Sequence, residues 1–307
     1  MRTERYIEPR DVPLDQFPAS RVGAARMQDL ASAPSASHPR VHLGVEYARV
    51  AGSPLHLQVI VPPGDGEDDR LPLVLYVPGS GWGPQDLGQH LAALIAFARR
   101  GFVVAIVEYR PSDPAPFPAQ VQDAVRALAF MRANAGRFRV DPDRVVAWGD
   151  SSGAHTSLLL AYGLEDPYFS GRDCESSSVR CVVDYFGPTD LATMNDEPSI
   201  CDHLGVESPE GVLMGGVDVL SAGERLERSR VLGQRARSRA RPRVLILHGD
   251  RDRLVGFGQS ATFADAVAED GDEVELYRVI GADHGGSVFW ADGTLDLVES
   301  FVRAALD

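Results

Sequence analysis

The stretch Arg144-Val145-Val146-Ala147-Trp148-Gly149-Asp150-Ser151-Ser152-Gly153-Ala154-His155 decides the fold of this chain. Its apolar first half predicts a buried strand, its last residues begin a helical pattern, and the turn between them fits G-x-S-x-G. In that motif the serine occupies a strained strand-to-helix turn that exposes its Oγ at the end of a sheet. The following helix points the positive end of its dipole at the serine, where negative charge develops during acyl transfer. Ser151 is therefore the candidate nucleophile.

The five-residue motif has two other interpretations. Such a pattern arises by chance in loops rich in glycine and serine, and Gly-Asp-Ser-Ser-Gly also resembles the serine segment of chymotrypsin-type proteases. In those proteases histidine and aspartate precede the serine, whereas α/β-hydrolases run in the order Ser, Asp, His. The positions of the candidate base and acid decide between the two folds.

A serine hydroxyl needs a general base, and four histidines follow Ser151 in the chain. His155 belongs to the helix after the nucleophile and is expected to face away from Oγ. His203 lies in an irregular segment, and His248 ends a strand. His284 lies in a loop of small residues after the last predicted strand, which is where an α/β-hydrolase carries its base. We therefore predict His284 as the base.

The stretch His248-Gly249-Asp250-Arg251-Asp252 offers two carboxylates for the acid of the triad. Asp250 follows the strand closely and could cap the turn. Asp252 lies further along the loop, where it can hold the tautomer of His284 and stabilise the imidazolium. We favour Asp252, and the resulting order, Ser151, Asp252, His284, excludes the chymotrypsin interpretation.

A candidate oxyanion hole follows an earlier buried strand, in Val77-Pro78-Gly79-Ser80-Gly81-Trp82. Backbone N–H groups of Ser80 or Gly81, together with that of Ser152, would hold the developing oxyanion. Because backbone groups would do this work, we expect the side chain of Ser80 to matter little. Without the serine motif this stretch would read as an ordinary glycine turn.

Strands and helices alternate along most of the chain, which predicts an α/β fold with a mostly parallel sheet covered by helices on both faces. An antiparallel entry hairpin is expected over residues 45–61. The remaining strands are expected at 71–77, 102–107, 144–150, 179–185, 244–247 and 273–279, and helices at 86–100, 118–135, through Tyr162, between the last two strands and after Leu295. The rhythm breaks between about 190 and 243, where we expect a small, partly helical insertion over the site. Residues 1–40 read as a leader or an arm, and 41–307 as the α/β domain.

Composition limits the partners of the protein. The formal net charge of −14 makes nucleic acids and anionic membranes unlikely partners by bulk electrostatics, and all thirty basic residues are arginine. No apolar h-region follows Met1–Arg5 and no apolar run reaches 18 residues, so we expect no signal peptide, no membrane span and a cytoplasmic location. Three cysteines read as free thiols, with a Cys174–Cys181 bridge as the alternative.

The ordered segments of residues 45–305 resemble the hormone-sensitive-lipase and feruloyl-esterase-like (BD-FAE) esterases. The matching stretches are Pro78–Trp82, Tyr109–Ser112, Phe117–Gln120, Asp141–Arg144, Gly149–Gly153, Phe186–Asp190, His248–Asp252 and Gly281–Gly285. The resemblance implies an α/β-hydrolase fold, no metal, no organic cofactor and Asp252 in the acid's place; we also expect Trp82 to contact the substrate. The family usually has His-Gly-Gly-Gly-Trp where this chain has Pro78–Trp82, so the bracing histidine is missing. It also usually has Ala-Gly-Gly where this chain has Ser152–Ala154.

These residues favour a serine carboxylesterase that hydrolyses small carboxylic esters through an acyl-enzyme on Ser151. One alternative is an amide or formamide hydrolase resembling kynurenine formamidase. Another is a non-catalytic binding protein on the same fold, which the altered loop permits. The acyl and alcohol specificity and the oligomeric state have no readable code in the sequence.

Overall fold

A computed structural model describes residues 9–30, 38–64, 70–170 and 178–307, and the chain divides into two units, Met1–Ala36 and Ser37–Asp307. In the first unit, residues 9–30 contain one short 3-10 turn, η1 (Leu14–Gln16), with none of its residues buried. The second unit contains all the strands that the structure describes. Its first strand begins at Arg40, close to the predicted start of the domain.

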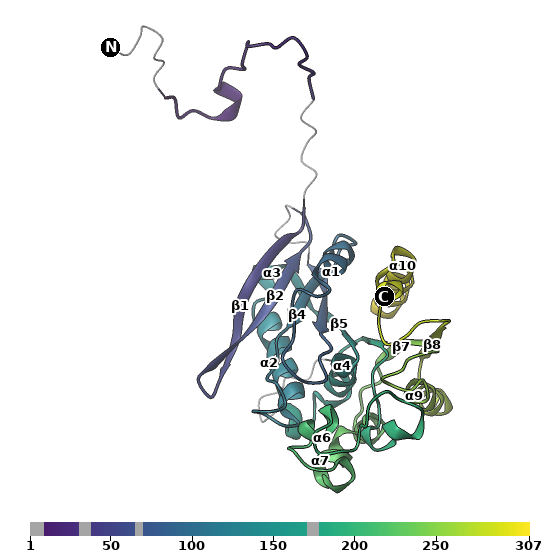
Figure 1. Ribbon diagram of the computed structural model, residues 1–307. Helices are drawn as coiled ribbons and strands as arrows, with labels where there is room; N and C mark the ends of the chain where they lie inside the picture. Colours follow the sequence, from purple (N-terminus) through teal and green to yellow (C-terminus); the bar gives the residue numbers. More distant parts are fainter. Residues whose placement is uncertain (1–8, 31–37, 65–69, 171–177) are drawn as a thin grey trace. The chain divides into compact units, whose positions relative to one another are not determined.

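The strands of the second unit form one sheet in the order β1-β2-β4-β3-β5-β6-β7-β8 (Figure 1). The entry hairpin pairs antiparallel, β2 pairs antiparallel with β4, and all later neighbours are parallel, as predicted. The strands are β1 (Arg40–Val50), β2 (Ser53–Val61), β3 (Leu71–Val77), β4 (Val103–Val107), β5 (Val140–Asp150), β6 (Cys181–Tyr185), β7 (Arg243–Gly249) and β8 (Val274–Val279).

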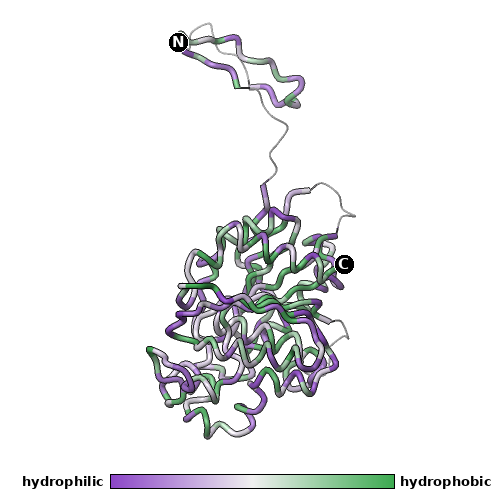
Figure 2. Tube along the Cα trace, turned by 90° about the vertical axis from the view of Figure 1, so that its right-hand side faces the viewer, coloured by the Kyte–Doolittle hydropathy of each residue, from purple (hydrophilic) through white to green (hydrophobic). Residues whose placement is uncertain are grey.

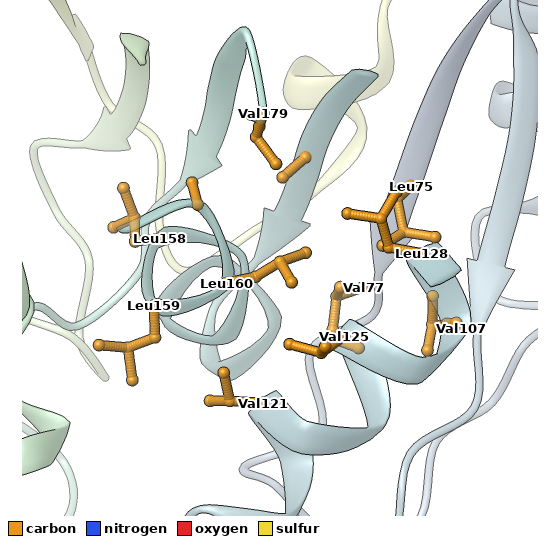
Figure 3. Close-up of a cluster of buried hydrophobic side chains, with 14 of the residues drawn as sticks. Leu75, Val77, Val107, Val121, Val125, Leu128, Leu158, Leu159, Leu160 and Val179 are labelled. Carbon is orange, nitrogen blue, oxygen red and sulfur yellow. The ribbon is translucent and has the colours of Figure 1, made fainter. Parts of the chain in front are cut away.

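Helices cover both faces of this sheet. On one face lie α2 (Ala119–Ala133), α4 (Ser152–Gly163) and α9 (Gly258–Glu269), and on the other lie α1 (Leu91–Ala98) and α10 (Asp292–Leu306). Figure 3 shows the first face, where Val121, Val125 and Leu128 of α2 lie near Leu158 and Leu160 of α4 and near Leu75 and Val77 of β3. The arrangement is the α/β-hydrolase fold.

Alternation along β3 explains why the sheet needs two helical layers. Leu73, Leu75 and Val77 belong to the core on the side of α2 and α4, whereas Val74 and Tyr76 belong to the core on the side of α1 and α10. Successive side chains of a strand point to opposite faces, so a strand that is apolar throughout must be buried on both. In Figure 2 the central strands are largely green and the peripheral segments largely purple.

The helix predicted from Asp86 begins only at Leu91. Asp86 explains the delay, because its carboxylate accepts a hydrogen bond from the N–H of Gly88 at 2.8 Å and forms a turn. Side-chain bonds of this kind compete with the helical backbone bonds. The apolar spacing of residues 91–98 correctly predicts a helix there, but this spacing does not show where the preceding turn ends and the helix begins.

The segment between β6 and β7 is partly helical, as expected. It contains η2 (Leu191–Asp196), α6 (Pro209–Leu213), η3 (Val219–Ser221), α7 (Glu224–Ser229) and α8 (Val231–Arg237). We keep the name insertion for residues 190–242. Some of its arginines pair with carboxylates of other segments, for example Arg228 with Asp166 and Arg235 with Asp272.

The sequence also led to expectations about membrane-spanning helices and about the cysteines. Among the described residues, no helix is long and apolar enough to cross a bilayer. Cys181 is a buried free thiol whose pKa burial raises to about 12, and Cys201 is an exposed free thiol. Cys174, the other half of the alternative bridge, lies outside the described residues.

Candidate active site

Ser151 lies at the turn between β5 and α4, with φ +52° and ψ −126°. A side chain in this left-handed region is strained, and its N–H is held by the carbonyl of Tyr185 at 2.8 Å. The neighbouring glycines leave no room for alternatives. A Cβ on Gly153 would lie 2.0 Å from the carbonyl oxygen of Val77, and one on Gly149 would lie 2.3 Å from the backbone of Gly153. The predicted turn is therefore present, and backbone packing requires its glycines.

The structure brings the three predicted triad residues together. Nε2 of His284 lies 2.9 Å from Oγ of Ser151, and Nδ1 of His284 lies 2.7 Å from Oδ2 of Asp252. The three residues come from loops after β5, β7 and β8. Parallel strands end at one edge of a sheet, which is why residues more than a hundred positions apart in the sequence converge there.

Asp252 is held as a carboxylate by several donors. Its Oδ1 accepts hydrogen bonds from the N–H groups of Leu254 and Val255, each at 2.8 Å, and its Oδ2 lies 3.2 Å from Nε2 of His248. Burial works to raise the pKa of Asp252, but the hydrogen bonds from His248 and His284 outweigh it and lower the pKa to about 2. The ionised carboxylate keeps the proton of His284 on Nδ1, so Nε2 is free to accept the Ser151 proton.

Asp250 has the capping role that was its alternative. Its Oδ1 accepts a hydrogen bond from the N–H of Gly281 at 2.6 Å, which ties the end of β7 to the turn after β8. Asp283 joins the same two loops, because it pairs with Arg253 and accepts from the N–H of His284. Asp250 and Asp283 thus connect the loop that carries Asp252 to the loop that carries His284.

The other downstream histidines make structural contacts. Nε2 of His155 donates to the carbonyl of Ser229 at 2.9 Å, which faces the ring away from Ser151 as expected. His248 is fully buried and bonds to Ser260 and to the carbonyl of Val255, so it supports the acid. His203 lies in the insertion and is discussed below.

The oxyanion loop, residues 78–83, lies against the nucleophile turn. The N–H of Gly79 donates to the Asp150 carboxylate and the N–H of Ser80 donates to Oγ of Ser152, each at 2.9 Å. Among the described residues, the N–H groups of Gly81 and Ser152 have no acceptor. Of the three predicted oxyanion donors, the N–H groups of Gly81 and Ser152 are therefore available, whereas the N–H group of Ser80 is already hydrogen-bonded to Ser152.

The hydroxyl of Ser80 takes part in holding this loop. It donates to the carbonyl of Gly83 at 2.8 Å and lies 2.9 Å from the Tyr109 hydroxyl, which donates to the carbonyl of Pro78 at 2.9 Å. Burial raises the pKa of Tyr109 to about 12, so this donor stays protonated. The Ser80 hydroxyl therefore bonds within the loop, together with those of Tyr109 and Ser152, and the expectation that this side chain matters little for activity stays a prediction.

Trp82 does not lie where a substrate contact would. Its side chain is 2% exposed and packs edge-on against the ring of His155, with the ring centroids 5.4 Å apart. The predicted role is corrected for a physical reason, because φ +57° at Trp82 turns the indole into the core beneath the loop. Space beside the loop is instead limited by the insertion, since a Cβ on Gly81 would lie 3.3 Å from the side chain of Pro209.

Phe186 and Tyr109 support the site, and the sequence singled out neither for such a role. Phe186 has φ +46°, and its ring packs against that of His284 at 4.7 Å. A bulky residue in this backbone region is a rare and strained feature. Both residues lie in stretches that the sequence marked only by their resemblance to a family. No local sequence pattern around either residue predicts its role.

The structure also bears on metal binding. Among the residues described, no three His, Cys, Asp or Glu side chains are grouped so that they could hold a metal ion. The chemistry that the arrangement supports is nucleophilic attack by Ser151, with His284 as base and with open N–H groups in the nucleophile turn and in the loop bonded to it.

Comparisons with known proteins give the same fold. A TM-score of 0.70 relates the chain to a truncated carbohydrate esterase from gut microbiota (24% identity, 88% of this chain and 96% of that chain). One of 0.69 relates it to esterase 2 of Thermogutta terrifontis (22% identity, 87% and 94%). At these identities the likeness shows the fold.

Similar sequences include the esterase LipQ of Mycobacterium tuberculosis, which is 25% identical over 217 residues that make up 70% of this chain and 50% of that protein. The carboxylesterase NlhH of the same organism is 36% identical over 95 residues, 30% of each chain. The chain spans about half the length of the first of these relatives. The BD-FAE family model matches residues 57–267, which is more than half of the chain. The chain therefore belongs to the BD-FAE family.

Proposed function

We propose that this protein is a serine carboxylesterase that hydrolyses small carboxylic esters through an acyl-enzyme on Ser151. The observation that carries the proposal is the unbroken chain of hydrogen bonds from Ser151 through His284 to Asp252. The open N–H group of Ser152 lies in the nucleophile turn, and that of Gly81 lies in the loop that is hydrogen-bonded to this turn. Nucleophile, base, orienting acid and oxyanion donors are the four parts that ester hydrolysis requires.

The reaction follows from these positions. Oγ of Ser151 attacks the ester carbonyl while Nε2 of His284 takes its proton, and the oxyanion accepts hydrogen bonds from Gly81 and Ser152. Asp252 stabilises the imidazolium, which then protonates the leaving alkoxide as the C–O bond breaks. A water molecule, deprotonated by His284, attacks the acyl group and releases the acid, and the proton returns to Ser151.

Names of the relatives support an ester substrate. LipQ is named an esterase, NlhH a carboxylesterase, and a rice relative of 27% identity over 222 residues a probable isoprenylcysteine alpha-carbonyl methylesterase. Esters also ask less of the general acid than amides, because an alkoxide leaves more easily than an amide nitrogen. The cytoplasmic location and the lack of a nucleic-acid partner stay predictions from composition.

The test combines an active-site label with turnover. A fluorophosphonate probe should label the wild type, and a series of p-nitrophenyl esters of increasing acyl length should be hydrolysed faster than N-formylkynurenine. Ser151→Ala should lose the label and about 10⁴-fold or more of the turnover while its melting temperature stays unchanged. Ser300→Ala, at an exposed serine of α10, is the matched control.

Two outcomes would contradict the proposal. More than a tenth of wild-type activity in folded Ser151→Ala would assign the nucleophile elsewhere. A wild type that binds ligands but is neither labelled nor active would point to the non-catalytic alternative, and faster turnover of the formamide would favour the amide hydrolase.

A further inference from the structure

His203 is a buried histidine of the insertion that the proposed reaction does not use. It is 2% exposed and lies between the loop that carries Asp252 and the short helix α6. Its backbone is fixed as well, since its N–H donates to the side chain of Asn195 and its carbonyl accepts from the hydroxyl of Ser208. The ring therefore has one position, with both nitrogens engaged.

Its partners determine the number of protons on the ring. Nε2 lies 2.9 Å from two oxygens, the carbonyl of Leu254, which can only accept, and Oγ of Ser199. The Ser199 hydroxyl has its own acceptors in the carbonyls of Arg253 and Leu254, so the hydrogen between Nε2 and Leu254 belongs to the ring. Nδ1 lies 3.1 Å from Oε1 of Glu210, and a hydrogen must lie between these two atoms because neither lone pair can face the other. The pair of His203 and Glu210 thus holds two protons, whichever partner formally owns the second.

The peptide group between Leu254 and Val255 connects this pair to the catalytic acid. Its carbonyl accepts from His203, and its N–H donates to Oδ1 of Asp252 at 2.8 Å. A trans peptide is planar, with its C=O and N–H pointing in opposite directions, so His203 and Asp252 hold the two ends of one rigid group. A charge-assisted bond at the carbonyl also polarises the N–H and strengthens its bond to Asp252.

Glu210 connects the same pair to the oxyanion loop. It lies in α6, whose first residue, Pro209, is the neighbour of Gly81. The last residue of α6, Leu213, accepts a hydrogen bond from the N–H of Phe117 at 2.9 Å. One buried ion pair therefore joins the loop of the acid to the helix that lies beside an oxyanion donor.

We propose that His203, held in its doubly protonated form by Glu210, is a positioning residue that fixes Asp252 through the Leu254–Val255 peptide and aligns the insertion with the oxyanion loop. The inference rests on the proposed esterase function. It predicts that loss of one proton from the pair breaks one of the two links, because a ring with a single N–H cannot donate to both Leu254 and Glu210.

The charges around the ring give the direction of the pH dependence. Burial works to lower the pKa of His203, but the hydrogen bond and charge of Glu210 outweigh it, with Asp202 adding to the effect, and raise the pKa above its usual range. The loop that carries Asp252 presents the uncharged carbonyl oxygen of Leu254 to the ring. The charged groups of that loop, Asp252 and Arg253, pair with His284 and Asp283 instead. A raised histidine pKa stabilises the fold at low pH and loses this contribution as the pH rises through the folded-state pKa, so the links fail on the alkaline side.

Three variants test the proposal by their kcat, KM and melting temperature from pH 6 to 10. His203→Gln can serve only one of the two partners, so its kcat should fall about tenfold or more at every pH while KM changes less than twofold. In Glu210→Gln, a neutral ring can accept from the amide at Nδ1 and still donate from Nε2 to Leu254. This variant should retain most of kcat at pH 7 and lose the alkaline fall in kcat and melting temperature that the wild type shows.

His56→Gln is the matched control, because His56 pairs with Glu108 at 2.8 Å on β2 and is partly exposed. It should leave kcat and its pH profile unchanged. An unchanged kcat in folded His203→Gln would overturn the proposal, as would an alkaline fall that persists in Glu210→Gln. A lower melting temperature with wild-type kcat would mean that His203 has only a structural role.

The fluorophosphonate label separates this inference from the proposed function. If the wild type is not labelled at Ser151 and hydrolyses no ester, the proposed function has failed. If the wild type is labelled but His203→Gln is labelled at the same rate, the proposed function stands and the inference has failed. Should His203→Gln not fold, the profile of Glu210→Gln alone decides between the two outcomes.

Discussion

At the scale of single residues, the site depends on which of two neighbouring aspartates points inward. The side chain of Asp252 is fully buried and bonds to His284, His248 and two N–H groups. The carboxylate of Asp250 is bonded to Gly281 in the turn after β8. A difference of two positions in the loop therefore separates the carboxylate that bonds to His284 from the one that caps the turn after β8.

Asp252→Asn should lower kcat by about 10⁴-fold, because an amide at this place favours the wrong tautomer of His284. Asp250→Asn should keep kcat within a few-fold and lower the melting temperature, since only the cap of the β8 turn is weakened. Steady-state kinetics with thermal unfolding of both variants checks this pair. The reverse pattern would move the acid to Asp250.

Much of the site was predictable at this scale, because the triad depends on chain order and on positions after strands. Ser151 and Asp252 each follow a strand with a continuous apolar run, His284 follows the last predicted strand, and the structure places the three within hydrogen-bonding distance. Trp82 was predicted wrongly, because the sequence does not show that its φ is positive and its ring buried. Tyr109 was missed because its contact with Ser80 spans 29 positions and follows no local spacing.

At the scale of elements, hydroxyl groups maintain the geometry of the oxyanion loop. Ser80 and Tyr109 together hold the carbonyls of Gly83 and Pro78, at the two ends of the loop. The open N–H of Gly81 lies between these two points. Its direction therefore depends on bonds that its own residue does not make.

Ser80→Gly and Tyr109→Phe should each lower kcat about three- to tenfold, as expected for loss of a neutral hydrogen bond of about 1 kcal/mol. The double variant should lose less than the product of the two, since both hydroxyls act on one loop. Tyr47→Phe, which removes the bond from a phenol of β1 to the carbonyl of Glu108, is the control and should keep wild-type kcat.

The size of the fall in kcat of Ser80→Gly shows whether the Ser80 hydroxyl acts on the loop or directly on the oxyanion. A hundredfold drop would show that the hydroxyl itself donates to the oxyanion, because losses of about 10²–10³ accompany removal of such a donor. Full activity in both single variants would return the Ser80 side chain to the idle role predicted from the sequence.

At the scale of the whole molecule, stability should depend on a carboxyl group remote from the surface. Asp184 of β6 is fully buried, and among the described residues its Oδ2 has no hydrogen-bond partner. Burial raises the pKa of Asp184 to about 7, against the opposing effect of a hydrogen bond from the N–H of Gly187. The folded chain therefore keeps a proton between about pH 4 and pH 7 that the unfolded chain has lost.

The free energy of unfolding should accordingly fall as the pH rises through this window and level off above it. Asp184→Asn has no such proton to lose, so its melting temperature relative to the wild type should increase by a few degrees from pH 5 to pH 9. Asp265→Asn, at an exposed position of α9, is the control. Parallel pH profiles of the wild type and Asp184→Asn would contradict the assignment.

The fold as a whole was predictable because strands buried on both faces have continuous apolar runs, as in β3 and β4. The contacts of the insertion were not predictable. They depend on ion pairs between residues far apart in the sequence, such as Arg228 with Asp166 and Arg235 with Asp272, whose spacing follows neither the period of a helix nor that of a strand.

The contact between Gly153 and the carbonyl of Val77 has a consequence for laboratory evolution. Since even a methyl group at this position would lie 2.0 Å from that oxygen, random libraries that span the nucleophile turn will consist mostly of inactive clones. Diversity is better placed at Ile200, Val206, Val217 and Leu220, which are exposed in the insertion and carry none of its buried ion pairs. Variation at these positions leaves the backbone contact of the nucleophile turn intact.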